Sequence, residues 1–373
     1  MTEKRAEPQT RHAAMEQKQP LVRIVRRPVM PLGQAWAIRG IAFLAALLAG
    51  ALLIGLLGHN PFLVYADMVV GALGARTSLI ETVKLTLPLL AAALSVALSF
   101  RMRFWNIGAE GQILAGGIAA SYFALFCYDM MPGWLLLIVM FLAAAVAGAL
   151  WGALPAVFKA KWNTNETLFT LMLNYVALGL VKYLEAGPWK KPGGYPKIDM
   201  FEDVARLPKL FGVHIGWLIT IALVILVAVY LRRSKHGYEA AVVGESPDTA
   251  RYAGMNVGRV LVRTMLFAGA IAGIAGFMQV SGADYTLHEG TAGGVGFTAI
   301  TVAWLAQLNP WGMVVVAAFL ALLDKGANRI HTTFGVPATA SDVLTGLILF
   351  FMLGCEFFIN YRLVFRKGAK ARG

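Results

Sequence analysis

Long apolar stretches alternate with short polar stretches along most of the chain. An α-helix that crosses the hydrocarbon core of a bilayer needs ~20 mainly apolar residues, and most of the stretches are close to that length. The pattern predicts an all-α, polytopic membrane bundle of about ten transmembrane helices. We place these helices at residues 36–58, 80–100, 107–127, 133–158, 166–184, 214–232, 262–281, 294–307, 310–324 and 341–360.

The eighth and ninth stretches, 294–307 and 310–324, are short, and only the sequence LNPWG separates them. They are either two spans or one broken or re-entrant segment. A re-entrant segment is tolerated at membrane depth only where its backbone is buried in protein or lines a cavity.

Both ends of the chain are polar and basic. We expect residues 1–35 to form a flexible cytoplasmic tail, 36–361 a single transmembrane domain, and 362–373 a basic C-terminal tail. With both termini in the cytoplasm, most of the 33 Lys and Arg residues lie on the cytoplasmic side, as the positive-inside rule requires. The loop 185–213 does not fit this orientation, because its five Lys and Arg residues would lie outside.

The composition supports a membrane protein. Of the residues, 58% are hydrophobic and 14% are charged, whereas a soluble domain usually has ~45–50% and ~25%. The formal net charge of +13 would suggest a nucleic-acid partner in a soluble protein. Here we expect no nucleic acid, because Lys and Arg concentrate at the cytoplasmic surface of membrane proteins and no nucleic-acid-binding motif is present.

Motifs for several kinds of chemistry are missing. The ATP-binding loop G-x-x-x-x-G-K-[ST] is excluded, because the chain has no Gly-Lys dipeptide. The stretch GVGFTA, residues 294–299, fits a dinucleotide pattern but follows no strand. Cys127 and Cys355 make no metal-binding spacing. We therefore expect no cofactor, no metal and no enzyme, although residues alone do not exclude a membrane-embedded enzyme.

The segment RMRFWNIGAEGQILAGG, residues 101–117, places polar residues at the edge of an apolar stretch. Asn106 is positioned to cap the helix that follows, and Glu110 faces the positive end of its dipole. Gln112 and Gly116 continue along one helical face. We interpret this face as the border of a translocation path; capping and packing of small residues are the alternative.

Two further segments carry polar residues. Glu166, Thr170 and Asn174 recur every four residues, so they share one helical face. That face avoids lipid and either lines a path or makes interhelical hydrogen bonds. In YTLHEGTAGGVGFTAIT, residues 285–301, glycines and threonines indicate a cavity wall or a tightly packed loop. Thr298 and Thr301 are the candidates there.

The loop 233–262 between two apolar stretches contains a short helix. Ser246 reads as its N-cap, Pro247 as its first residue and Asp248 as an acid favoured by the helix dipole. Gly254 ends it after about seven residues. A short, firmly capped helix presents a fixed shape, so we interpret it as an element that docks to a partner.

Four collinear segments resemble one family. FWNIGAEGQILAGG, NETLFTLMLNYVALGL, VVGESPDTARYAGMNVGRV and GGVGFTAITVAWLAQLNPWG are similar to signatures of the ABC importer permeases of the branched-chain amino acid/ribose type. The nucleoside and simple-sugar uptake permeases are the most similar branch. The resemblance covers residues 77–361. The chain departs from the pattern at Trp105, at Thr249 and at the run 301–304, TVAW.

The resemblance implies a multi-pass subunit of a bacterial cytoplasmic membrane importer that moves a small polar solute by alternating access. Separate ABC ATPase subunits, a second identical or related permease subunit and an extracytoplasmic solute-binding protein are the implied partners. A nucleoside is the expected solute, and a monosaccharide importer or a self-contained secondary transporter is the alternative. The implied ATPase-coupling residues are Glu245, Ser246, Pro247, Asp248, Ala250, Arg251, Tyr252 and Gly254. The path candidates are Asn106, Glu110, Gln112, Asn174, Thr298 and Thr301.

Overall fold

The computed structural model of the protein describes residues 22–27, 30–193 and 195–365. The chain divides into two compact units: residues 50–349 form one, and residues 1–49 with 350–373 form the other. The predicted tails, 1–35 and 362–373, lie largely outside the described residues.

The smaller unit joins the two ends of the chain. Strand β1 (Val22–Arg26) pairs antiparallel with β4 (Tyr361–Phe365), with Val22 opposite Phe365. Helix α1 (Leu32–Leu56) begins in this unit and α13 (Ala338–Asn360) ends in it. An ion pair of 2.7 Å between Arg39 Nη2 and Glu356 Oε1 holds the two helices together.

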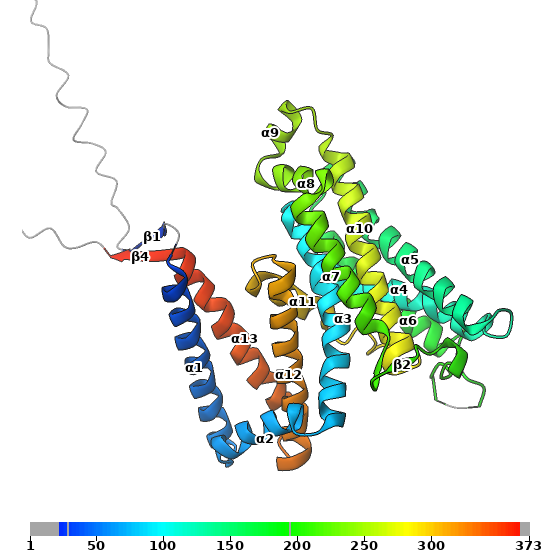
Figure 1. Cartoon of the computed structure of the whole chain (residues 1–373), viewed down its shortest axis with the longest axis horizontal. Helices are drawn as coiled ribbons and strands as arrows, with labels where there is room; N and C mark the ends of the chain where they lie inside the picture. The colour runs from blue at the N-terminus through cyan, green and yellow to red at the C-terminus, as the bar shows by residue number, and fades with distance from the viewer. Residues whose placement is uncertain (1–21, 28–29, 194, 366–373) are drawn as a thin grey trace, which may run out of the picture. The chain divides into compact units, whose positions relative to one another are not determined.

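The larger unit is a helical bundle (Figure 1). Its helices are α2 (Pro61–Leu73), α3 (Arg76–Arg101), α4 (Ala109–Phe126), α5 (Gly133–Trp162), α6 (Glu166–Ala186), α7 (Gly216–Arg233), α8 (Lys235–Glu245), α9 (Pro247–Tyr252), α10 (Val257–Met278), α11 (Val295–Leu305) and α12 (Pro310–Phe334). Shorter elements are the 3₁₀ helix η2 (Asp203–Ala205), the π-helix η3 (Gln279–Asp284) and a hairpin of β2 (Lys209–Leu210) and β3 (Val213–His214). Figure 1 shows α8 and α9 at one end of this unit and β2 at the other.

Each predicted apolar stretch coincides with a helix, and seven of the described helices are long and apolar enough to cross a bilayer. Those seven are α1, α3, α5, α6, α7, α10 and α12. The count of about ten spans and the cytoplasmic position of both termini therefore stay predictions. Helix α2 was not predicted.

The eighth and ninth predicted stretches, 294–307 and 310–324, form two helices of unequal length. Helix α11 has 11 residues, so at 1.5 Å per residue it is about 16 Å long, roughly half of the hydrocarbon core. Helix α12 continues to Phe334 and has 25 residues. The predicted end of this stretch at 324 was therefore wrong by ten residues.

Glycine packing holds the bundle together where α4, α5 and α10 meet. Gly148 of α5 lies directly against the backbone of Gly269 and Gly273 in α10, and Gly273 lies against the Ala144 carbonyl. Gly116 of α4 contacts the backbone of Gly273 from the other side. Interfaces of small residues allow membrane helices to approach closely and to gain dispersion energy.

The segment between α6 and α7 closes over the π-helix at one end of the bundle. Phe201 N donates to Tyr285 O at 2.7 Å, and Leu207 N donates to Ser281 O at 2.9 Å. His214 is 1% exposed and packs against Gly216 and Gly282. Burial, with the nearby charge of Lys84, lowers the pKa of His214 to about 4.

We predict that Gly273→Ala destabilises the purified protein in detergent. The added methyl group meets the Ala144 carbonyl in the glycine interface, and overpacking of this kind costs ~1–3 kcal/mol. Gly179→Ala in α6 is the matched control, because no atom lies within 4 Å of the added group. The temperature of thermal unfolding should fall only in the first variant. Equal unfolding temperatures of the two variants would contradict the tight interface.

We also predict that acid destabilises the protein through His214. The neutral imidazole is buried, whereas the unfolded chain takes up a proton near pH 6.5. The folded state is fully stabilised above pH 6.5 and loses this contribution as the pH falls toward 4. The two pKa values differ by an amount equivalent to about 3 kcal/mol. His214→Gln should flatten the melting temperature between pH 7.5 and pH 5; an unchanged slope would show that another group is responsible.

Candidate functional site

The side chain of Glu110 joins two helix N-termini. It stands in the first turn of α4, and its carboxylate accepts a hydrogen bond from Gly294 N at Oε1 and from Gly296 N at Oε2, each 2.7 Å long. These two amides belong to the beginning of α11, where an intrahelical acceptor is missing. One carboxylate thus compensates the positive ends of two helices.

The beginning of α11 requires glycine. Gly294 caps the helix with φ +81°, a left-handed conformation that glycine adopts without steric cost. A Cβ atom at Gly296 would collide with the backbone nitrogen of Glu110. The glycines of the 285–301 segment therefore serve close approach between α11 and α4, which is the tightly packed alternative of the sequence interpretation.

Asn106 and Gln112 form a buried amide pair beside this contact. Their side chains are 0% and 1% exposed, and the Gln112 Nε2 to Asn106 Oδ1 distance is 3.4 Å. Asn106 Oδ1 also accepts from Gly108 N at 2.9 Å. The predicted cap was wrong in position: Gly108 is the N-cap residue of α4, and Asn106 fixes the turn before it.

The polar stripe of α6 faces the same turn. Asn174 accepts from Gly111 N and donates to the Ile107 carbonyl, both at 2.8 Å. Thr170 Oγ1 accepts from Ile107 N at 3.2 Å. Both side chains are buried, so the stripe faces the bundle interior as predicted, and its contacts are those of the hydrogen-bonding alternative. Glu166 pairs with Lys159 at 3.1 Å.

Thr298 and Thr301 lie on α11, partly exposed. Thr298 donates to the Gly294 carbonyl and lines a cavity of about 140 Å³ together with Gly293 and Asp324. Asp324 was not among the predicted path residues, because the ninth stretch was predicted to end there. Asp324 lies inside α12, and ionisable groups within membrane spans are often functional.

The predicted docking helix exists as α9, six residues long. Ser246 caps it, accepting from Thr249 N at 3.2 Å, and Arg251 pairs with Asp248 at 2.7 Å. Gly254 follows with φ +78°. Six of the eight predicted coupling residues are exposed, whereas Ser246 is half-buried and Ala250 is buried. Tyr252 is 94% exposed.

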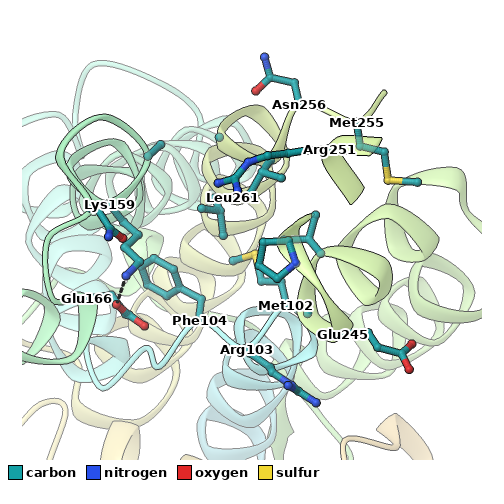
Figure 2. A pocket seen from close by; sticks show the side chains of 17 residues that line it. Met102, Arg103, Phe104, Lys159, Glu166, Glu245, Arg251, Met255, Asn256 and Leu261 are labelled. Carbon is teal, nitrogen blue, oxygen red and sulfur yellow. Dashed lines mark ion pairs between the residues drawn. The ribbon is translucent and has the colours of Figure 1, made fainter. Parts of the chain in front are cut away.

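A pocket of about 680 Å³ lies beside α9 (Figure 2). Met102 and Phe104 are among its lining residues, as is Arg251, and the Lys159–Glu166 ion pair lies on one side. The buried Ala250 packs in one hydrophobic cluster with Met102 and Phe104. Helix α9 therefore shares a hydrophobic cluster with the segment that connects α3 to α4.

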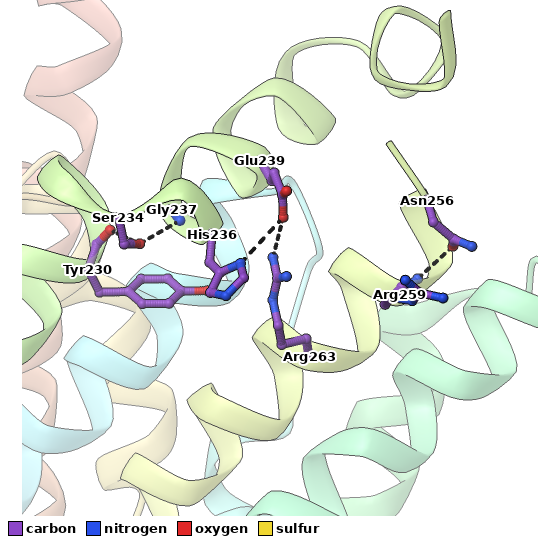
Figure 3. A network of polar contacts seen from close by, with 8 residues as sticks. All are labelled: Tyr230, Ser234, His236, Gly237, Glu239, Asn256, Arg259 and Arg263. Carbon is purple, nitrogen blue, oxygen red and sulfur yellow. Dashed lines mark hydrogen bonds and ion pairs between the residues drawn. The ribbon is translucent and has the colours of Figure 1, made fainter. Parts of the chain in front are cut away.

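Helix α8, which was not predicted, precedes α9 and is paired to α10 (Figure 3). Ser234 caps α8, accepting from Gly237 N at 2.9 Å. Glu239 pairs with Arg263 of α10 at 2.7 Å. The hydrogen bond from Arg263, and the neighbouring His236, hold the pKa of Glu239 below its usual value despite the opposing effect of desolvation.

We predict that Glu110→Gln loosens the junction of α4 and α11. Glutamine has only one acceptor oxygen, so one of the two glycine amides loses its partner, at a cost of ~1–3 kcal/mol. The melting temperature should fall, and proteolysis within 285–294 should accelerate. Glu81→Gln is the control, because Glu81 is half-exposed and pairs only along its own helix, where ion pairs contribute ~0–1 kcal/mol. Equal behaviour of the two variants would contradict the bridging role.

Comparison with known proteins identifies the family. The family described as branched-chain amino acid transport system / permease component matches residues 78–353. The glucose ABC transporter permease TsgB13 of Haloferax volcanii is 34% identical over 90% of this chain and 92% of its own length.

Two bacterial relatives are similar over most of their length. The guanosine ABC transporter permease NupP of Bacillus subtilis is 31% identical over 84% of this chain and 91% of its own length. The nucleoside ABC transporter permease NupB of Lactococcus lactis is 30% identical over 89% of this chain and 94% of its own length. These matches confirm the resemblance found in the sequence: the chain belongs to the branched-chain amino acid transport system permease family.

Proposed function

We propose that the chain is the permease subunit of an ATP-binding-cassette importer in the cytoplasmic membrane of a bacterium. The family match over 78–353 carries the proposal, and the capped, exposed helix α9 supports it. The subunit works with separate ATPase subunits, a second permease subunit that is identical or related, and an extracytoplasmic solute-binding protein.

The ATPase docks on α9. Arg251 and Tyr252 project from this helix, while Ala250 is buried in the hydrophobic cluster that includes Phe104 and Met102. An exposed tyrosine on a rigid support is typical of the few residues that dominate the affinity of an interface. Movement of α9 would pass to the segment 102–108 through this cluster.

The solute passes beside the junction of α4, α6 and α11. Thr298 and Thr301 contact it in our proposal, since both are partly exposed on α11. Asn106, Gln112 and Asn174 are buried, so they reach the path only when α11 separates from α4. That step breaks the two hydrogen bonds of Glu110. Glu110 therefore holds α11 against α4 until that step of alternating access.

A nucleoside is the proposed solute. Two of the relatives reported above are permeases for guanosine and for nucleosides. A monosaccharide is the second candidate solute, and the observation behind it is the 34% identity to a glucose permease. Uptake of tritiated guanosine and of labelled glucose by cells that express the whole transporter separates these two.

The solute-binding protein docks on the end opposite α9. A pocket of about 680 Å³ there is lined by Trp189, Lys190, Asp199 and Arg206, among others. Arg206 donates two hydrogen bonds to the Phe201 carbonyl, at 2.9 and 2.7 Å. The mixture of aromatic rings and opposite charges in this pocket suits a polar protein interface.

The function is tested by reconstitution in liposomes. The permease, its ATPase and its binding protein should together accumulate solute inside, and only with ATP. A purified permease that moves the solute without ATP or partners would contradict the proposal and favour a secondary transporter.

We predict that Tyr252→Ala weakens binding of the ATPase by about 30-fold or more, because hot-spot residues contribute at least ~2 kcal/mol. Tyr195→Ala is the matched control: Tyr195 is 88% exposed but lies in the segment between α6 and α7. Co-purification of the ATPase with the permease measures the effect. Full ATPase binding in the first variant, or its loss in the control, would place the docking surface elsewhere.

A further inference from the structure

Two tryptophans that lie far apart in the sequence stack on each other. Trp105 precedes α4 and Trp304 lies near the end of α11, and both belong to segments where the chain departs from the family pattern. Their ring centroids are 5.8 Å apart and the ring planes differ by 25°. Phe100 of α3 contacts both, at 5.3 and 5.8 Å between centroids. The three rings form one aromatic cluster.

The cluster is fixed on one side and open on the other. Phe100 is 7% exposed and supports the rings from inside, whereas Trp105 is 48% and Trp304 is 44% exposed. Within the described part of the chain, neither indole N–H donates a hydrogen bond to another residue. A rigid aromatic surface with two open donors is therefore available to a ligand.

Polar groups accompany the rings. Thr301 lies one turn before Trp304 on α11 and is partly exposed, and its hydroxyl has no hydrogen-bond partner within the described residues. Asn106 follows Trp105 directly but is buried, and it accepts a hydrogen bond from Gly108 N. Helix α11 itself begins at the carboxylate of Glu110. Polar groups in a membrane protein usually face a water-filled cavity or the bundle interior rather than lipid, so this side of the rings belongs to the solute path.

We propose that Trp105 and Trp304 form an aromatic platform on which the planar base of a nucleoside stacks during transport. The proposal rests on the proposed function and specifies its substrate class. A nucleobase offers a flat π-face to the indole rings, and its carbonyl oxygens and ring nitrogens accept hydrogen bonds from the indole N–H groups. Stacking of a base on an aromatic side chain contributes ~1–3 kcal/mol. A monosaccharide has no π-system and offers only C–H groups to the rings.

Binding of tritiated guanosine to the purified chain, with unlabelled glucose as competitor, tests the platform. We expect Trp304→Leu and Trp105→Leu to weaken guanosine binding roughly tenfold, equivalent to about 1.4 kcal/mol. Trp304→Phe keeps a ring and should bind more tightly than Trp304→Leu. The matched control is Trp134→Leu on α5, because Trp134 is 67% exposed and is outside the cluster. Glucose should not displace guanosine.

Three results would overturn the platform: guanosine binding as in the wild type in both leucine variants, an equal loss in Trp134→Leu, or displacement of guanosine by glucose at equal concentration. Thermal unfolding of each variant shows whether a loss of guanosine binding reflects misfolding. If a leucine variant is misfolded, guanosine binding to Trp304→Phe decides instead.

Uptake by the reconstituted complex separates this inference from the proposed function. A complex that imports glucose but not guanosine leaves the importer intact and contradicts the platform. Guanosine binding that depends on the two tryptophans, without ATP-driven uptake, supports the platform and contradicts the importer.

Discussion

The arrangement of this bundle depends on one half-buried carboxylate. Glu110 holds the beginning of α11 against the beginning of α4 through two hydrogen bonds of 2.7 Å. A helix as short as α11 cannot cross a bilayer, so its N-terminus must end inside the protein with four amides that lack intrahelical acceptors. In a medium without water each unpaired amide costs several kcal/mol. The carboxylate satisfies two of them, and Gly296 makes the close approach sterically possible.

Much of this could be predicted from the sequence, because length and hydropathy determine where membrane helices form. The stripe of Thr170 and Asn174 was also predictable, since its spacing places both on one helical face. The partner of Glu110 was not, because the pattern assigns the carboxylate to its own helix dipole and says nothing of a second helix 184 residues later. Asp324 was missed for a simpler reason: hydropathy ends a span at an acid, whereas the helix continues through it to Phe334.

The other tertiary contacts likewise follow from residue types whose partners the sequence does not specify. Glycine permits close approach, but only the structure shows that Gly148 and Gly273 meet each other. The aromatic cluster is a similar case. Trp105 and Trp304 stand out individually as departures from the family pattern, and their stacking becomes visible only once α11 is placed beside α3.

The segment 102–108 connects these features. Phe104 belongs to the hydrophobic cluster that includes Ala250 of α9, Trp105 stacks on Trp304 of α11, and Asn106 fixes the turn that leads into Glu110. Three consecutive residues thus link the hydrophobic cluster below α9, the aromatic cluster and the start of α4. Packed interiors transmit displacement because they are close to crystal density and resist compression. In the proposed mechanism, force applied to α9 therefore has a short route to the two hydrogen bonds of Glu110, which break when α11 separates from α4.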